Sequence, residues 1–116
     1  MLNDVASVAV RTALTGLAMR QRVTADNIAN IETPGFLAGR VSFEDSLRSA
    51  IASGTSPDGV SPSLDRSLEP TRLSGSNVNL DHEILSNVDT GLRYQLMLRA
   101  VDNKAGLIST VLRPGG

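Results

Sequence analysis

The side chains of this 116-residue chain that could carry out acid-base or metal chemistry meet at Asp81-His82-Glu83. Two carboxylates beside an imidazole offer the ligand atoms that bind zinc, or a proton donor and acceptor. Adjacent residues on a helix point in different directions, so these three cannot converge on one ion. His82 is the only histidine and the chain has no cysteine. We therefore predict no catalytic residue, no metal site and no cofactor, and interpret the two acids as a solvated first helical turn that complements the helix dipole.

A second group of polar residues lies where a helical pattern ends. Asn27 and Asn30 stand three residues apart, so they share one helix face, and both amides can reach the backbone where the chain leaves the helix. We interpret them as C-capping and turn residues. A fixed exit angle would also place the next segment, residues 37–53, where a neighbouring subunit can meet it.

The residues after this helix predict a tight turn. Thr33 precedes a proline and is pushed toward extended geometry, while Pro34-Gly35 suits the two central positions of a type II turn. Phe36 should then pack back on Ile28 or Ile31. The complete predicted assembly motif is Asn27, Ile28, Asn30, Thr33, Pro34, Gly35 and Phe36.

A long helix must position this motif. From Asn3 to about Ile31 there is no proline, and apolar residues recur at steps near three and four. Asn3 or Asp4 can cap its first turn. Its predicted packing seam includes Val10, Leu14, Leu17 and Ile28.

A second long helix is predicted in the C-terminal region, residues 77–116. Asn79 or Asp81 can cap its start, Arg113 suits its last turn, and Pro114 to Gly116 end it. Its predicted seam is Ile84, Val88, Tyr94, Leu98, Val101 and Ile108. Two helices of similar length at the two ends of a chain most simply pair antiparallel.

The middle of the chain is predicted to be less regular. Ser42 reads as the N-cap of a short amphipathic helix that ends at Ser53-Gly54. Residues 54–76 are rich in Gly, Pro and Ser and read as a flexible loop or small β insertion, with a weak strand pair near residues 64–73. The predicted fold is mainly α: an antiparallel hairpin or coiled coil of long terminal helices. Its parts are residues 1–33, 34–53, 54–76 and 77–116.

Composition limits the functions open to the chain. A formal net charge of −1 argues against a nucleic-acid partner. One histidine, no cysteine and no Gly-rich phosphate loop argue against a small hydrolase or metalloenzyme, so we expect no small-molecule substrate. No apolar run is long enough for a secretory signal or a membrane helix. Only three residues are aromatic, and the aliphatic seams exceed what one hairpin can cover. We therefore predict self-association or docking.

The run Asn-Ile-Ala-Asn-x-x-Thr-Pro-Gly-Phe at 27–36 resembles the flagellar axial proteins of bacteria. Residues 77–83, and 92–95 followed by Lys104 and Leu107, resemble the C-terminal region of the proximal rod proteins of the FlgB type. The resemblance implies a structural subunit of the basal body, not an enzyme, that helps to form the hollow shaft transmitting torque.

The same resemblance implies the partners and the location. The partners would be other rod proteins, proteins of the junction between membrane ring and rod, and the flagellar type III export apparatus. The subunit would span the periplasm after export without a cleaved signal peptide. The alternative function is a small helical-hairpin adaptor or secretion chaperone, which would be compact on its own.

Overall fold

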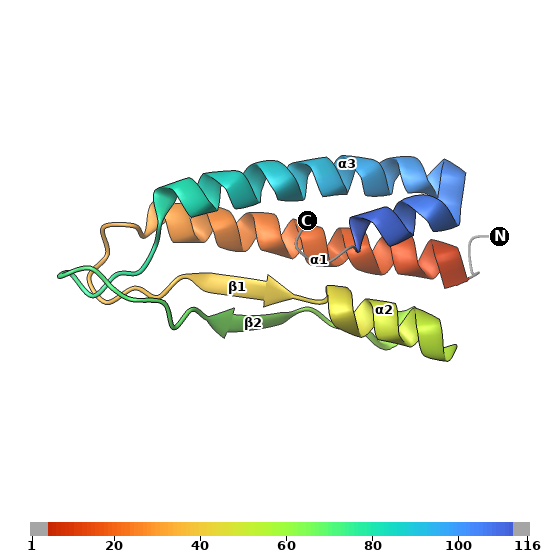
Figure 1. The fold of residues 1–116 in the computed structure, drawn as a ribbon, viewed down its shortest axis with the longest axis horizontal. Helices are drawn as coiled ribbons and strands as arrows, with labels where there is room; N and C mark the ends of the chain where they lie inside the picture. Colours follow the sequence, from red (N-terminus) through yellow and green to blue (C-terminus); the bar gives the residue numbers. More distant parts are fainter. Residues whose placement is uncertain (1–4, 113–116) are drawn as a thin grey trace.

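The computed structural model describes the backbone of residues 5–112 and the side chains of residues 5–100 and of Leu112. Two long helices, α1 (Val5–Ala29) and α3 (Leu80–Val111), lie side by side and antiparallel (Figure 1). Between them come β1 (Gly39–Ser42), α2 (Glu44–Ser53), the 3-10 helix η1 (Pro57–Gly59) and β2 (Ser63–Arg66). The predicted mainly helical fold, with paired terminal helices and a small two-stranded sheet, is confirmed.

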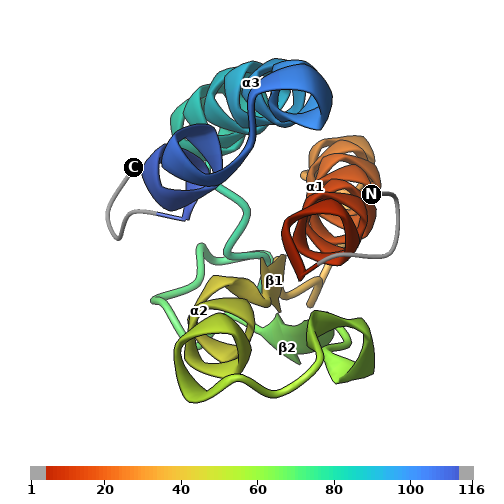
Figure 2. The same cartoon turned by 90° about the vertical axis from the view of Figure 1, so that its right-hand side faces the viewer.

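The segments between the long helices form a second layer against α1, which Figure 2 shows end-on. β1 and β2 pair antiparallel, with Gly39 opposite Arg66 and Ser42 opposite Ser63. The C-terminal end of α3 bends back along the bundle (Figure 1), and Leu112 joins the core. The buried core consists of Ala9, Val10, Ala13, Leu17, Val41, Phe43, Leu47, Met97, Ala100 and Leu112.

The strand pair is not the local hairpin expected near residues 64–73. β2 does lie inside the segment 54–76, but its partner β1 precedes α2. β1 escapes a pattern-based prediction because Val41 is its only aliphatic residue, so it shows no long alternation of apolar and polar positions.

The short amphipathic helix lies close to its predicted place. Gly54 closes it with a φ of 77°, and its N–H donates to the Ile51 carbonyl (3.3 Å). Ser42, predicted as the N-cap, belongs to β1 instead. Phe43 occupies the cap position without a side-chain hydrogen bond, and its ring is buried. Packing of this ring, not capping, therefore positions the start of α2.

The N-terminal helix also resembles its prediction. α1 ends two residues before Ile31, and its predicted caps Asn3 and Asp4 lie outside the described residues. The predicted seam residues of this helix are all at least partly buried: Val10, Leu14, Leu17 and Ile28.

The predicted seam of the C-terminal helix is wrong as a face packed on α1. Ile84, Val88 and Leu98 are 47%, 56% and 50% exposed. Val101 and Ile108 lie outside the described side chains. The helix ends at Val111, and its predicted terminal residues 113–116 lie outside the described chain.

The buried face of α3 is largely polar in its first half. Tyr94, beside this face, is partly buried against the core. Among the α3 side chains that the structure describes, the buried ones are Glu83, Thr90, Arg93, Met97 and Ala100. Their steps near three and four follow one side of a helix. A prediction from hydrophobic periodicity selects the opposite, more apolar side, because it gives no weight to a polar group such as Glu83 that finds partners inside the molecule.

Candidate assembly site

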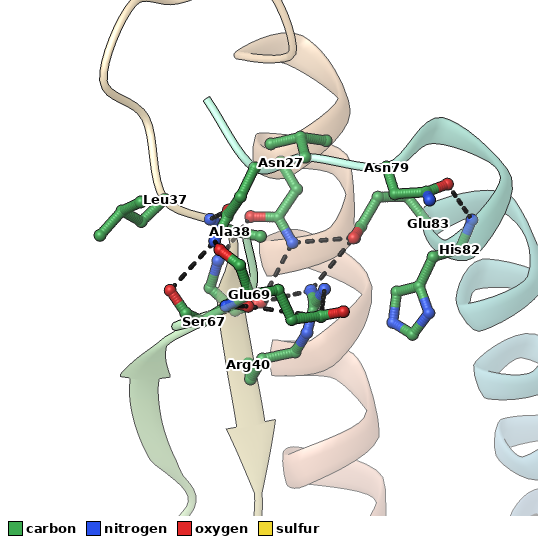
Figure 3. Close-up of polar contacts among 12 residues, drawn as sticks. Asn27, Leu37, Ala38, Arg40, Ser67, Glu69, Asn79, His82 and Glu83 are labelled. Carbon is green, nitrogen blue, oxygen red and sulfur yellow. Dashed lines mark hydrogen bonds and ion pairs between the residues drawn. The ribbon is translucent and has the colours of Figure 1, made fainter. Parts of the chain in front are cut away.

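Asn27, near the end of α1, lies buried at the junction of three elements (Figure 3). Its Oδ1 accepts a hydrogen bond from the Gly39 N–H (2.8 Å), and its Nδ2 donates to the Gly39 carbonyl (3.0 Å). The same Nδ2 donates to Oε1 of Glu83 (2.8 Å). The amide gives Gly39 the two bonds that a neighbouring strand would give it. It thus ties α1 to β1 and to α3.

Gly39 permits this close approach of strand and helix. A Cβ on this residue would lie 2.8 Å from Cγ1 of Val23 and 3.0 Å from Cδ1 of Leu64. A larger residue would push β1 away from α1, and the bonds to Asn27 would lengthen. Gly39 is therefore as much a part of the site as the asparagine.

Glu83 is the acidic centre of the junction. It lies in the first turn of α3 and is 1% exposed. Its second oxygen, Oε2, accepts a bond from Arg40 Nη1 (3.0 Å), which also donates to the Gly39 carbonyl (3.1 Å). Arg40 Nη2 lies 3.7 Å from a Glu69 oxygen. The prediction of a solvated Glu83 is wrong, because a buried carboxylate is acceptable once charged and amide donors surround it.

Asn77 forms a second buried amide junction next to the first. Its Oδ1 accepts from the Ala38 N–H (2.7 Å), and its Nδ2 donates to the Ser67 carbonyl (3.1 Å). The Asn77 N–H donates to the Phe36 carbonyl (3.1 Å). Because the Ser67 N–H also donates to the Ala38 carbonyl (2.8 Å), the amide widens and extends the two-stranded ladder by one step. The segment before α3 is thereby fixed to both strands.

Asn30 and the turn after it have the predicted local geometry. Asn30 Nδ2 donates to the Asp26 carbonyl (2.9 Å), and its Oδ1 accepts from the Thr33 hydroxyl (3.0 Å). The Phe36 N–H donates to the Thr33 carbonyl (3.2 Å), and Gly35 has a φ of 76°, as a type II turn requires. Only Asn30 is a local capping residue, whereas Asn27 reaches other elements.

Phe36 and Arg72 make further contacts near the end of α1 and the start of α3. The Phe36 ring lies under the Arg66 guanidinium (5.6 Å to the ring centre), and its predicted contact with Ile28 or Ile31 stays a prediction. No motif in the sequence marks Arg72, yet it donates to the Ile31 carbonyl (2.7 Å) and to the Val78 carbonyl. One side chain thus binds the exit of α1 and the approach to α3.

A different contact anchors α2. Arg20 of α1 donates from both terminal nitrogens to the two oxygens of Glu44, and its guanidinium lies 5.2 Å from the centre of the Phe43 ring. Burial alone raises the pKa of the Glu44 carboxyl, but the hydrogen bond and charge of Arg20 outweigh it, so the pKa lies below its ordinary value. Gly16 leaves room for this arrangement, since a Cβ there would lie 2.4 Å from the ring.

The Asp81-His82-Glu83 cluster is divided between the surface and the buried junction. Asp81 and His82 are exposed, and Asn79 Oδ1 accepts from the His82 N–H (3.1 Å), so Asn79 caps α3. Among the described residues, no group of three or more His, Cys, Asp or Glu side chains could hold a metal ion. Nor does any helix in residues 5–112 have the length and hydropathy of a membrane span. What the geometry does is fix where α1 ends and where α3 begins.

A family model described as flagella basal body rod protein matches residues 9–36. The matched part runs along α1 through Asn27 and Asn30 and ends at Phe36. The buried amide junction and the turn after it therefore both include residues of the family pattern.

Curated relatives match most of the chain. The flagellar basal body rod protein FlgB of Borreliella burgdorferi is 30% identical over 118 residues, covering 84% of this chain and 87% of the relative. The protein of the same name from Yersinia enterocolitica is 30% identical over 123 residues, covering 89% and 90%. That from Bacillus subtilis is 28% identical over 121 residues, covering 91% and 92%.

Proposed function

The chain belongs to the flagellar basal body rod proteins of the FlgB type, and from this we propose that it is a structural subunit that assembles with copies of itself and other axial proteins into the torque-transmitting shaft. Its partners in this proposal are other rod proteins, proteins of the junction between membrane ring and rod, and the flagellar export apparatus. It acts without catalysis and spans the periplasm, and its export involves no cleaved signal peptide.

The observation that carries this proposal is that α3 exposes apolar side chains and buries polar ones. Leu85, Val88 and Leu92 are 70%, 56% and 59% exposed, while the opposite side buries Glu83 and Arg93. We call the exposed face the α3 stripe, and its members are Leu80, Ile84, Leu85, Val88, Leu92 and Leu98. An exposed apolar face of this kind is typical of a surface that another protein covers.

The size of the effect suits a subunit contact. Fully burying a leucine or valine stabilises by about 1.5–3 kcal/mol, so covering these half-exposed side chains contributes roughly 1 kcal/mol each. Together they supply several kcal/mol, part of which offsets the entropy lost on association. A single contact is then modest, and stable structure requires many subunits.

The buried junctions give the stripe a defined orientation. Asn27 and Arg40 hold Glu83 from two other elements, and Glu83 lies on the side of α3 away from the stripe. Buried, fully paired polar groups select one arrangement more strictly than aliphatic contacts, which can slide. A helical assembly needs that strictness, because a small angular error is repeated at every subunit.

The test compares the full chain with two single-charge variants. Val88→Asp places a carboxylate in the α3 stripe, and Ser49→Asp places one on an exposed position of α2 as a matched control. Sedimentation velocity of purified protein should show concentration-dependent oligomers for the wild type and Ser49→Asp, and a shift to monomer for Val88→Asp. Circular dichroism should give the same helix content for all three.

The same variants are then introduced into a strain that lacks this protein. Rods should stop at the membrane ring in the deletion strain and in Val88→Asp, and Ser49→Asp should restore them. Complete rods in the deletion strain would refute the proposal. A wild-type chain that stays monomeric, with every amide of α3 protected from hydrogen exchange, would favour the adaptor or chaperone instead.

A further inference from the structure

Leu73 belongs to the segment between β2 and α3, whose loop reaches the end of the molecule opposite to α2 in Figure 1. It is fully exposed, with a relative exposure of 110%. It lies in a turn closed by a hydrogen bond from the Gly75 N–H to the Arg72 carbonyl (2.8 Å). Gly75 has a φ of 85° and packs against the backbone of Gly35, where a Cβ would lie 3.1 Å away. The leucine is therefore held outward on a braced turn.

The opposite end of the molecule has a hollow of about 410 Å³ between α1 and the η1 segment. η1 is held to α1 by a hydrogen bond from the Thr12 hydroxyl to the Pro57 carbonyl (3.3 Å). The apolar part of the lining comes from Val8, Val60 and Pro62, and Val60 also packs on the core. The rest of the lining is Arg11, Thr12, Thr15 and Asp58.

We propose that the Leu73 turn of one copy inserts into this hollow of a second copy. The inference rests on the proposed function, since it names one contact by which copies associate. An aliphatic side chain in full contact with water gains by packing on the apolar part of this hollow, and the hollow has ample volume for it.

The charges beside the two surfaces fix the orientation of the contact. Arg72 precedes Leu73 and donates to carbonyl and hydroxyl oxygens, so within the described residues no carboxylate pairs with it. Asp58, on the η1 side of the hollow, accepts from the neutral Ser56 hydroxyl (2.6 Å). Arg11 lies on the α1 side of the same rim. The entering turn therefore places Arg72 next to Asp58 and away from Arg11.

This geometry leads to an open string of subunits. The two surfaces are different and lie at opposite ends of a molecule 52 Å long, so the contact is heterologous. A heterologous contact leaves one free surface at each end of the assembly, so further subunits can add unless the rotation between subunits closes a ring. The α3 stripe runs along the side of the molecule and stays available for other contacts.

The natural absence of cysteine makes a cross-linking test direct. Leu73→Cys and Thr15→Cys are made as separate full-length chains; both positions are exposed, so neither variant disturbs the core. The two are mixed under a mild oxidant. The control mixture replaces Leu73→Cys with Ser49→Cys, at an exposed position of α2 outside the α3 stripe. We expect disulfide heterodimers to form roughly tenfold or more faster in the first mixture, because the contact raises the local thiol concentration.

A second arm measures self-association of Leu73→Asp by sedimentation. The dissociation constant should rise roughly tenfold to a hundredfold while helix content stays unchanged. Oligomers that form normally in Leu73→Asp, with cross-linking no faster than the control, would overturn this contact and leave the rod-subunit proposal standing. A wild-type chain that does not associate, cysteine variants that cross-link no faster than the control, and complete rods in the deletion strain would together overturn both.

Discussion

Replacing Asn27 by alanine removes three hydrogen bonds from the junction of α1, β1 and α3. The Gly39 carbonyl keeps its bond from Arg40, so it remains paired. The Gly39 N–H loses its partner, and Oε1 of Glu83 loses its amide donor. Both groups are buried, and each unpaired buried group costs about 1–3 kcal/mol, with charged groups at the upper end.

The net effect is smaller than the sum of these costs. Alanine is a better helix former than asparagine by roughly 0.6 kcal/mol, which offsets part of the loss. We therefore expect Asn27→Ala to lower the free energy of unfolding by roughly 2–5 kcal/mol. This is a large part of the total stability of a small domain, which is about 5–15 kcal/mol.

Asn30→Ala is the matched control, since it removes the same side chain one turn later. Asn30 bonds only to nearby groups that water can reach, so its loss should cost less than about 1 kcal/mol. Urea unfolding followed by circular dichroism at the helix band measures both variants, and equal m-values would show that the transitions are comparable. If the two substitutions cost the same, Asn27 contributes no more than a local cap, and the junction does not hold the fold together.

Three further outcomes are expected. Gly16→Ala should destabilise the chain by about 1–2 kcal/mol in urea unfolding, because the clash with the Phe43 ring exceeds the gain in helix propensity; a stabilised variant would contradict the packing argument. The pKa of Glu44 is lower in the folded chain than in the unfolded chain, so the free energy of unfolding should fall as the pH drops below about 4.5 and through the folded-state pKa. Glu44→Gln cannot pair with Arg20 as a charge, so it should flatten that part of the curve of stability against pH. A curve unchanged by Glu44→Gln would refute this explanation. Gly35→Ala should cost about 1 kcal/mol in the same assay, because the residue has a positive φ and nothing near it that a methyl group would strike; no loss would mean that the turn relaxes to another type.

The parts of this structure that depend on neighbours in sequence were predictable. The proline-free, periodic stretch before Ile31 specifies a helix, and Pro34-Gly35 specifies the turn that follows. Gly54 likewise marks the end of α2. In each case the deciding interactions join residues within four positions of each other, so local pattern is sufficient.

The rest depends on partners far away in the chain. Asn27 resembles an ordinary capping residue, and only the fold brings Gly39 and Glu83 to its amide. Arg72 bonds to a carbonyl 41 residues earlier, a contact that no spacing rule suggests. The prediction of which face of α3 packs inward is wrong for the same reason: the polar face turns inward because Glu83 has partners there. Where polar groups determine packing, the most apolar face of a helix is a poor guide to its inner side.

The two-stranded sheet also has a consequence for how this chain can change. Ser42 and Ser63 lie opposite each other in the ladder, so the segment that contains α2 and η1 starts and ends at the same end of the sheet. The long helices and the amide junctions lie outside this segment, beyond the Ser42–Ser63 pair. Extra sequence added between Ser53 and Ser56 would lengthen this segment without moving Ser42 and Ser63, where it begins and ends. The hairpin can thus act as a constant base that carries an outer part of variable size.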